Sequence, residues 1–164
     1  MTVSICTLAH GRASHLAHLV KGLTHSPRPP SELIVAVMQE ARYELPATSF
    51  PVRQVLIGGS EVCLAEARNT AARHARGDLL VFLDVDCIPT PRLVDDYAAA
   101  SAFNDGVLMG EVGYLPKGAT DRGIDYDRFE QLAVEHSERA GPPRGMVGRC
   151  NDYRCFWSLN FAIP

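Results

Sequence analysis

Residues 64–86 read LAEARNTAARHARGDLLVFLDVD and join a helical pattern to a strand pattern. Small and apolar residues recur at helical spacing over 64–76, and Gly77 is typical of the position that ends a helix. The apolar run Leu79 to Leu83 is typical of a strand buried on both faces. We therefore predict a helix, a stop and a buried strand, with Asp84-Val85-Asp86 at the carboxyl end of that strand.

The same alternation extends over the rest of the chain. Apolar runs predict further strands over 3–8, 33–38, 52–57, 107–112 and 155–161. Helical periodicity and an N-cap at Thr90 predict further helices over 16–23, 90–103 and 126–139. The remaining long segments, 39–51 and 140–149, have the composition of loops, and we expect the second to be mobile. This order indicates an α/β fold with three α/β/α layers and a mostly parallel, doubly wound sheet, formed as one domain over 1–164.

Bulk composition excludes several classes of protein. Apolar residues make up 46% of the chain and charged residues 21%, which is typical of a globular protein and not of a disordered one. The formal net charge of −3 gives no indication of a nucleic-acid surface. No apolar run reaches the roughly 20 residues of a membrane helix. The five cysteines are an odd number without a signal peptide, which favours reduced thiols and a cytoplasmic location.

The triplet Asp84-Val85-Asp86, called the acidic triplet below, has the spacing of a metal site. Residues two apart at a strand end point to the same side, so Asp84 and Asp86 should lie together. Paired carboxylates repel unless a cation lies nearby, and their oxygens suit Mg²⁺ or Mn²⁺, which leave positions open for phosphate. A solvated acidic pair is the simpler interpretation. Asp84 could also contact a ribose and leave Asp86 as the main metal ligand.

At this point the block 64–86 resembles the central block of family-two glycosyltransferases, which have the GT-A fold. Two outer segments are similar more loosely: 3–7 together with Arg12 resembles the opening strand of that family, and 156–161 resembles a later segment near the acceptor site. The resemblance implies that the 164 residues are an N-terminal, donor-binding portion. It also implies that Asp84 and Asp86 hold Mn²⁺ or Mg²⁺ against a nucleoside-diphosphate sugar.

The resemblance assigns the nucleotide to four further positions. Thr7 and the backbone near Ala9 should lie against the base and ribose. Arg68 should lie near the nucleotide, because a guanidinium suits phosphate and base edges, although a salt bridge on the helix surface is an equal alternative. Arg12 could reach a phosphate, and a surface arginine at a helix start is again the alternative.

The chain departs from the family pattern in two places. The family usually has an acidic residue after its second strand, where this chain has Gln39, whose amide could still pair with a base. The base of these generally inverting enzymes is expected in an acidic pair beyond Pro164, so we assign no catalytic residue. The portion is thus expected to lack the acceptor and base segment.

Three residues are candidates for the acceptor side. Glu111 follows a glycine at a predicted strand end, although a solvated carboxylate is the more common case. Trp157 could stack on a sugar, although core packing is its more common role. Asn160 belongs to the segment that resembles the region near the acceptor site.

Together these features predict a metal-dependent transferase that uses a UDP- or GDP-sugar and an acceptor glycan, lipid or small molecule. A non-catalytic nucleotide-sugar-binding domain is one alternative. A nucleotidyltransferase is another, but it would need a glycine-rich loop after the first strand, where this chain has only His10-Gly11-Arg12. Apolar surface left by a missing segment could let the chain form homo-oligomers.

Overall fold

The computed structural model describes residues 1–58, 63–121, 123–135 and 147–164. Within them a six-stranded sheet has the order β3-β2-β1-β4-β8-β5. The first four of these strands are parallel, and β8 runs antiparallel to both of its neighbours. The bounds are β1 Val3–Ala9, β2 Glu32–Val37, β3 Val52–Leu56, β4 Leu79–Leu83, β5 Leu108–Met109 and β8 Asn160–Ile163.

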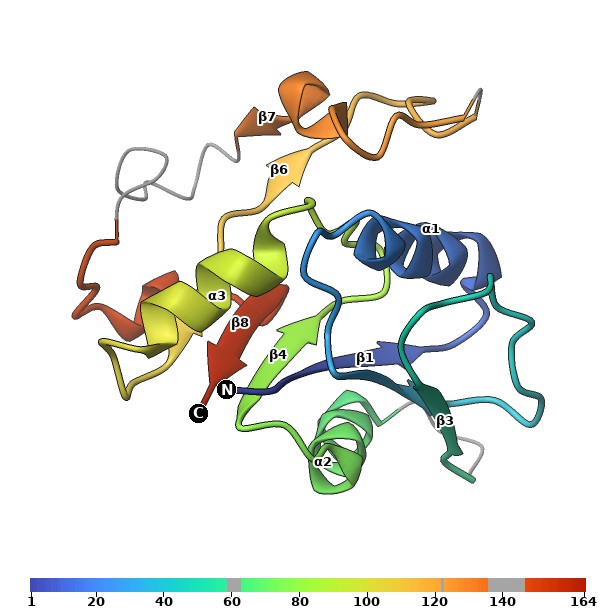
Figure 1. Ribbon diagram of the computed structural model, residues 1–164. Coiled ribbons are helices and arrows are strands. Elements are labelled where there is room, and N and C mark those ends of the chain that lie inside the picture. The colour runs from blue at the N-terminus through green and yellow to red at the C-terminus, as the bar shows by residue number, and fades with distance from the viewer. Residues whose placement is uncertain (59–62, 122, 136–146) are drawn as a thin grey trace.

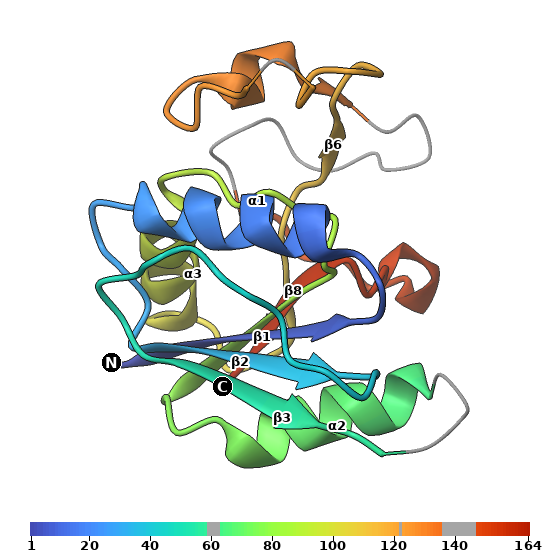
Figure 2. The same cartoon turned by 90° about the vertical axis from the view of Figure 1, so that its right-hand side faces the viewer.

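Helices cover both faces of this sheet, which confirms the predicted three-layer α/β/α fold. Helices α1 (Ala13–Thr24) and α3 (Leu93–Ser101) lie on one face, and α2 (Leu64–His74) lies on the other (Figures 1 and 2). The α2 face uses alanines, and Ala67 and Ala71 are completely buried. Because alanine side chains are small, this helix can lie close to β1 and β2.

Strand β1 shows why the central strands are mostly apolar. Val3, Ile5 and Ala9 belong to the core under α1, whereas Cys6 and Leu8 belong to the core over α2. Alternate side chains of a strand point to opposite faces, so a strand between two helical layers is buried on both faces and favours apolar residues. The sequence signal for β1, β2 and β4 therefore comes directly from their place in the sheet.

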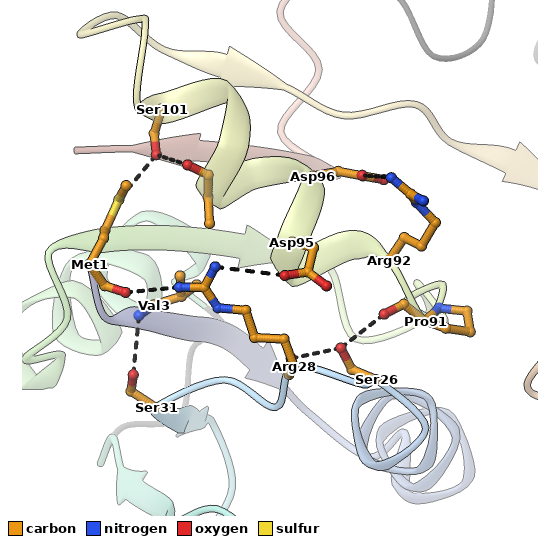
Figure 3. A network of polar contacts seen from close by, with 11 residues as sticks. Met1, Val3, Ser26, Arg28, Ser31, Pro91, Arg92, Asp95, Asp96 and Ser101 are labelled. Carbon is orange, nitrogen blue, oxygen red and sulfur yellow. Dashed lines mark hydrogen bonds and ion pairs between the residues drawn. The ribbon is translucent and has the colours of Figure 1, made fainter.

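A polar network fastens the N-terminus and α3 to the connection between α1 and β2 (Figure 3). Arg28 donates to the carbonyl of Met1 at 3.0 Å and forms an ion pair with Asp95 of α3 at 3.6 Å. The buried Ser26 hydroxyl lies 2.9 Å from the carbonyl of Pro91, which precedes α3. These contacts hold the layer of α1 and α3 together at its polar margin.

A smaller substructure lies over α1 (Figure 1). It contains the two-stranded sheet of β6 (Gly113–Tyr114) and β7 (Val134–Glu135) and the 3₁₀ helix η1 (Phe129–Leu132). Tyr126 connects it to α1, because its hydroxyl lies 2.6 Å from Nδ1 of His18 and its ring stacks on His25 with centroids 5.0 Å apart. A second 3₁₀ helix, η2 (Tyr153–Cys155), precedes β8.

The predicted helix over 126–139 is wrong within the described residues. The described part of this segment forms turns and the short 3₁₀ helix η1, and Asp125 accepts a hydrogen bond from the backbone N–H of Asp127 at 3.0 Å at its start. Phe129 is buried, but Leu132 is 55% exposed, so the apolar periodicity has no surface to cover. Residues 136–146, with the end of this prediction and most of the predicted loop over 140–149, lie outside the described residues.

Other predicted boundaries shift for local reasons. Thr90 is not the N-cap of α3, because Leu93 donates to its carbonyl and the helix begins only after Arg92. The strand predicted over 107–112 is only β5, since the chain leaves the sheet at Gly110, and the strand predicted over 155–161 is found at 160–163. Gly77 has no positive φ, and it is required because a Cβ there would lie 2.7 Å from the Ser4 amide.

Among the described residues, no helix combines the length and the apolar character that crossing a bilayer requires.

Replacement of Gly22 by alanine should lower the stability of the fold. Gly22 lies in α1, and a Cβ there would be 2.8 Å from the carbonyl oxygen of Pro89. The backbone fixes the position of a Cβ, so rotation of the side chain cannot relieve this contact. Overpacking of about 1–3 kcal/mol exceeds the gain of up to about 1 kcal/mol in helix propensity. We expect G22A to lower the free energy of unfolding by about 1–2 kcal/mol in urea titrations. G106A is the control, because a Cβ at Gly106 meets no atom within 4 Å; equal stability of G22A and wild type would contradict the packing argument.

Candidate functional site at the carboxyl edge of the sheet

Three connections meet at the carboxyl end of β4. The acidic triplet follows β4, the β1–α1 turn lies beside it, and the turn at 158–159 returns to it just before β8. The amide of Asp84 donates to the carbonyl of Leu159 at 2.9 Å, and the thiol of Cys87 lies 3.5 Å from the same carbonyl. These bonds fix the backbone from which both acidic side chains project.

Asp84 is the more buried of the two acids. Its Oδ1 accepts a hydrogen bond from Nη2 of Arg68 at 3.0 Å, and the two side chains are 25% and 23% exposed. Burial raises the pKa of Asp84 above its ordinary value, and Arg68 opposes this rise through its hydrogen bond and its charge. Nη2 of Arg68 also donates to the hydroxyl of Ser158 at 3.1 Å, so this arginine joins α2 to the turn before β8.

Asp86 lies nearer to solvent and has a different cation. Nη1 of Arg12 donates to its Oδ2 at 2.6 Å, with the side chains 54% and 44% exposed. Arg12 comes from the turn between β1 and α1, so the two ends of this ion pair are far apart in the sequence. The two acids thus face two guanidinium groups, one from α2 and one from the β1–α1 turn.

The β1–α1 turn is held by the loop that follows β2. Oε1 of Gln39 accepts hydrogen bonds from the amide of Gly11 at 3.0 Å and from the hydroxyl of Tyr43 at 2.9 Å. Gly11 has a φ of +64°, which glycine adopts without strain. Nε2 of Gln39 donates to the carbonyl of Ala41, which leaves its second N–H hydrogen for another acceptor.

The two positions predicted on β1 lie inside the protein. Thr7 is 1% exposed, and its hydroxyl has no hydrogen-bond partner among the described residues. The side chain of Ala9 is completely buried, and its carbonyl accepts from the amide of Met38. Neither side chain reaches the surface next to Asp84 and Asp86.

The acceptor-side candidates are separated by burial. Glu111 is exposed, and Trp157 is partly buried. Asn160 is 6% exposed, and its amide accepts from the Tyr97 hydroxyl at 2.8 Å and donates to the carbonyl of Glu111 at 3.0 Å. The Asn160 amide therefore holds the chain where it leaves β5.

Ser158, Tyr43 and Gln54 take part in this site but were not predicted from the sequence. Gln54 on β3 bonds both backbone groups of Tyr43, at 2.8 and 2.9 Å, which places the tyrosine hydroxyl over the β1–α1 turn. Tyr43 lies in the irregular segment 39–51, where no periodicity marks a residue. Ser158 had one signal, its place inside the segment 156–161 that resembles the region near the acceptor site.

The donor set of this edge suits a hard divalent cation. Asp84 and Asp86 provide two carboxylates, and no group of three or more His, Cys, Asp or Glu residues with metal-site geometry occurs in the described part of the chain. Mg²⁺ commonly binds through one or two carboxylates and completes its coordination with water and substrate phosphates. The two carboxylates and the two guanidinium groups beside them are thus suited to an anionic ligand that binds together with a divalent cation.

Comparisons with known proteins show the family of the chain. The family described as Glycosyl transferase family 2 matches residues 4–123, which include both acids and both arginines. No curated protein matches the chain.

Similar solved structures have the same GT-A type of fold. Residues 1–349 of S. aureus TarS in complex with UDP-GlcNAc align with a TM-score of 0.57 at 17% identity, over 76% of this chain and 37% of that one. The mannosyltransferase PcManGT from Pyrobaculum calidifontis, in complex with GDP-Man and Mn²⁺, aligns with a TM-score of 0.54 at 17% identity. This alignment covers 68% of this chain and 35% of PcManGT. The chain therefore spans little more than a third of the length of these proteins, and the likeness confirms the predicted fold.

Removal of the Arg68 charge should raise the pKa of Asp84 further. Burial already raises this pKa, and Arg68 opposes the rise more strongly than the more distant Arg12 does. In R68M the same buried carboxylate loses its neutralising partner, so protonation becomes easier. Carbon-13 NMR titration of the Asp84 carboxyl measures the change. R92M, which removes an arginine paired with Asp96 on α3, should leave the titration of Asp84 unchanged, and the same result for R68M would contradict the assigned pair.

Replacement of Asn160 by alanine should destabilise the fold itself. The variant leaves the Tyr97 hydroxyl without this acceptor and the Glu111 carbonyl without this donor, at a buried site where each loss is costly. We expect a loss of about 1–3 kcal/mol in the free energy of unfolding. N104A removes an exposed asparagine and should cost no more than about 0.5 kcal/mol. Equal free energies of unfolding for N160A and the wild type would show that the amide does not hold this connection.

Proposed function

Since this chain belongs to glycosyl transferase family 2, we propose that it forms the donor-binding part of a glycosyltransferase and binds a nucleoside-diphosphate sugar at the carboxyl edge of its sheet. Ligands of open α/β sheets bind at this edge. The observation that carries the proposal is the placement of Asp84 and Asp86 at the end of β4, each against an arginine from another element.

The charges of the site suit a diphosphate. A diphosphate brings several negative charges to an edge where two carboxylates are already balanced by two guanidinium groups. An added divalent cation is therefore needed to hold it, and Asp84 and Asp86 would hold Mn²⁺ or Mg²⁺ there. Bound to both, the cation would neutralise charge on the diphosphate as it leaves the sugar.

The arginines have separate roles in this proposal. Arg68 is only 23% exposed and fixed by both Asp84 and Ser158, so it orients Asp84 and presents one edge to the nucleotide. Arg12 is the more exposed and can contact a phosphate. PcManGT is described with GDP-Man and Mn²⁺ and TarS with UDP-GlcNAc, which supports a nucleotide-sugar donor here and leaves the base and sugar open.

The nucleobase contacts are proposed to involve backbone more than side chains on β1. Thr7 and Ala9 are buried, so their contribution would come through the shape and backbone of the strand end. Gln39 has one amide hydrogen left, because its other hydrogen and its oxygen hold Ala41, Gly11 and Tyr43. A single donor could read one carbonyl of a base.

The acceptor side is proposed less specifically. Glu111 and Trp157 remain candidates for contact with an acceptor glycan, lipid or small molecule, and Asn160 would support that side through the backbone it holds. Inversion at the anomeric carbon is expected of the family, and no residue is assigned as the base.

Replacement of Asp86 by asparagine should remove the metal dependence of donor binding. The amide cannot supply the anionic oxygen that a divalent cation prefers. We expect wild-type protein to bind UDP- or GDP-sugar more tightly with Mn²⁺ than without it, and D86N to lose at least about tenfold in affinity when Mn²⁺ is present. Isothermal calorimetry with each nucleotide sugar, with and without Mn²⁺, measures both affinities.

The matched control is D96N, which breaks an exposed aspartate–arginine pair on α3 and should bind the donor as the wild type does. If neither UDP nor GDP nor their sugars bind with or without Mn²⁺, the proposed function is wrong.

A further inference from the structure

The ion pair between Arg12 and Asp86 occupies one of the two carboxylates proposed for the metal. Nη1 of Arg12 lies 2.6 Å from Oδ2 of Asp86, and a guanidinium at this distance engages one of the two oxygens that this carboxylate can offer to a divalent cation. Two cations at one carboxylate also repel each other. Arg12 therefore competes with a divalent cation for Asp86 as long as the ion pair is formed.

Hydrogen bonds hold the backbone that carries Arg12, whereas its side chain extends to the surface. Gly11 is bonded to Gln39, and the carbonyl of Arg12 accepts the first hydrogen bond of α1 from Leu16 at 3.0 Å. Tyr43 contacts this turn, because its hydroxyl accepts hydrogen bonds from the amides of Gly11 and Arg12. Burial raises the pKa of Tyr43, and these hydrogen bonds oppose that rise. The Arg12 side chain is nevertheless 54% exposed.

Arg68 is different in this respect. It is 23% exposed and bonded to Ser158 as well as to Asp84, so its removal from the acid would break contacts on two sides. Of the two arginines at the acidic triplet, Arg12 is the one that can be displaced at low cost. Exposed ion pairs of this kind contribute little to stability.

We propose that Arg12 is an internal counter-ion for Asp86 that a nucleotide diphosphate draws away, so that the divalent cation binds weakly alone and more tightly together with the nucleotide. This inference rests on the proposed function. Arginine matches phosphate oxygens through a planar fork of donors, so a diphosphate offers Arg12 a new partner. The released Asp86 and the phosphate oxygens then both become available to the metal.

Mn²⁺ binding in the absence of nucleotide tests the proposal directly, with free Mn²⁺ measured by electron paramagnetic resonance. R12Q should bind Mn²⁺ about three- to tenfold more tightly than the wild type, because the competing cation is gone. R12K retains a positive charge near Asp86 and should stay closer to the wild type. R92Q removes an equal charge from the pair with Asp96 on α3 and should stay within about twofold of the wild type.

The nucleotide supplies the second half of the test. UDP or GDP should raise the Mn²⁺ affinity of the wild type by a larger factor than that of R12Q, after subtraction of the Mn²⁺ that each nucleotide binds in solution. In R12Q the obstruction is already absent, so the nucleotide has less to relieve. Equal enhancement in both proteins would overturn the proposal.

Tyr43 provides a variant that leaves all charges in place. Y43F removes the hydroxyl that bonds Gln39 and lies beside the turn, so the position of Arg12 on Asp86 becomes less well fixed. Y43F should therefore raise Mn²⁺ affinity in the wild-type background and have no effect in the R12Q background. An equal effect in both backgrounds would contradict the connection through Arg12.

The outcomes separate this inference from the proposed function. If R12Q and wild type bind Mn²⁺ equally while D86N loses the metal, the counter-ion role is wrong and the donor site stands. If no protein binds either Mn²⁺ or nucleotide, both proposals fail.

Discussion

Strand β4 lies in the middle of the sheet, hydrogen-bonded to β1 along one edge and to β8 along the other. Helical layers cover both of its faces, and Leu79, Val81 and Leu83 are at most 2% exposed. A strand enclosed in this way can carry no charge along its length, because a buried charge without a partner is too costly. Charge can begin only where the strand ends, and Asp84 is the first residue beyond it. The position of the whole site follows from this enclosure.

The elements that the sequence predicted well are those whose periodicity arises from burial. The parallel strands β1 to β4 and the helices α1 and α2 have apolar patterns that match the faces they bury. Short strands are different: β5, β6 and β7 have two residues each, and their pairing depends on distant partners and not on local pattern. The segment 126–135 shows the opposite case. Its apolar residues have helical spacing, but the predicted helix does not form, and Leu132 has no surface to cover.

The charged residues of the site could be predicted from the sequence, but which arginine pairs with which acid could not. Asp84 and Asp86 stand out because they follow an apolar run, and Arg68 and Arg12 were found through a family resemblance. Which arginine faces which acid depends on side-chain reach across the sheet edge, which spacing does not encode. The amide of Gln39 could still pair with a base, and the structure shows that most of its hydrogen-bonding capacity is used on the loops around it. Tyr43, which completes that arrangement, has no signal in the sequence around it.

The place of β8 between β4 and β5 has a consequence for folding order. β8 follows both strands in the sequence, and it pairs Asn160 with Leu83 across a long stretch of intervening chain. Closing such a loop costs entropy and makes the pairing slow, so β1 to β4 can assemble first with one edge of β4 still open. The amide of Asp84 finds its acceptor at Leu159 only when β8 arrives. A nascent chain can therefore have its parallel strands before it has the site, and the acidic turn takes its final shape only when β8 pairs with β4.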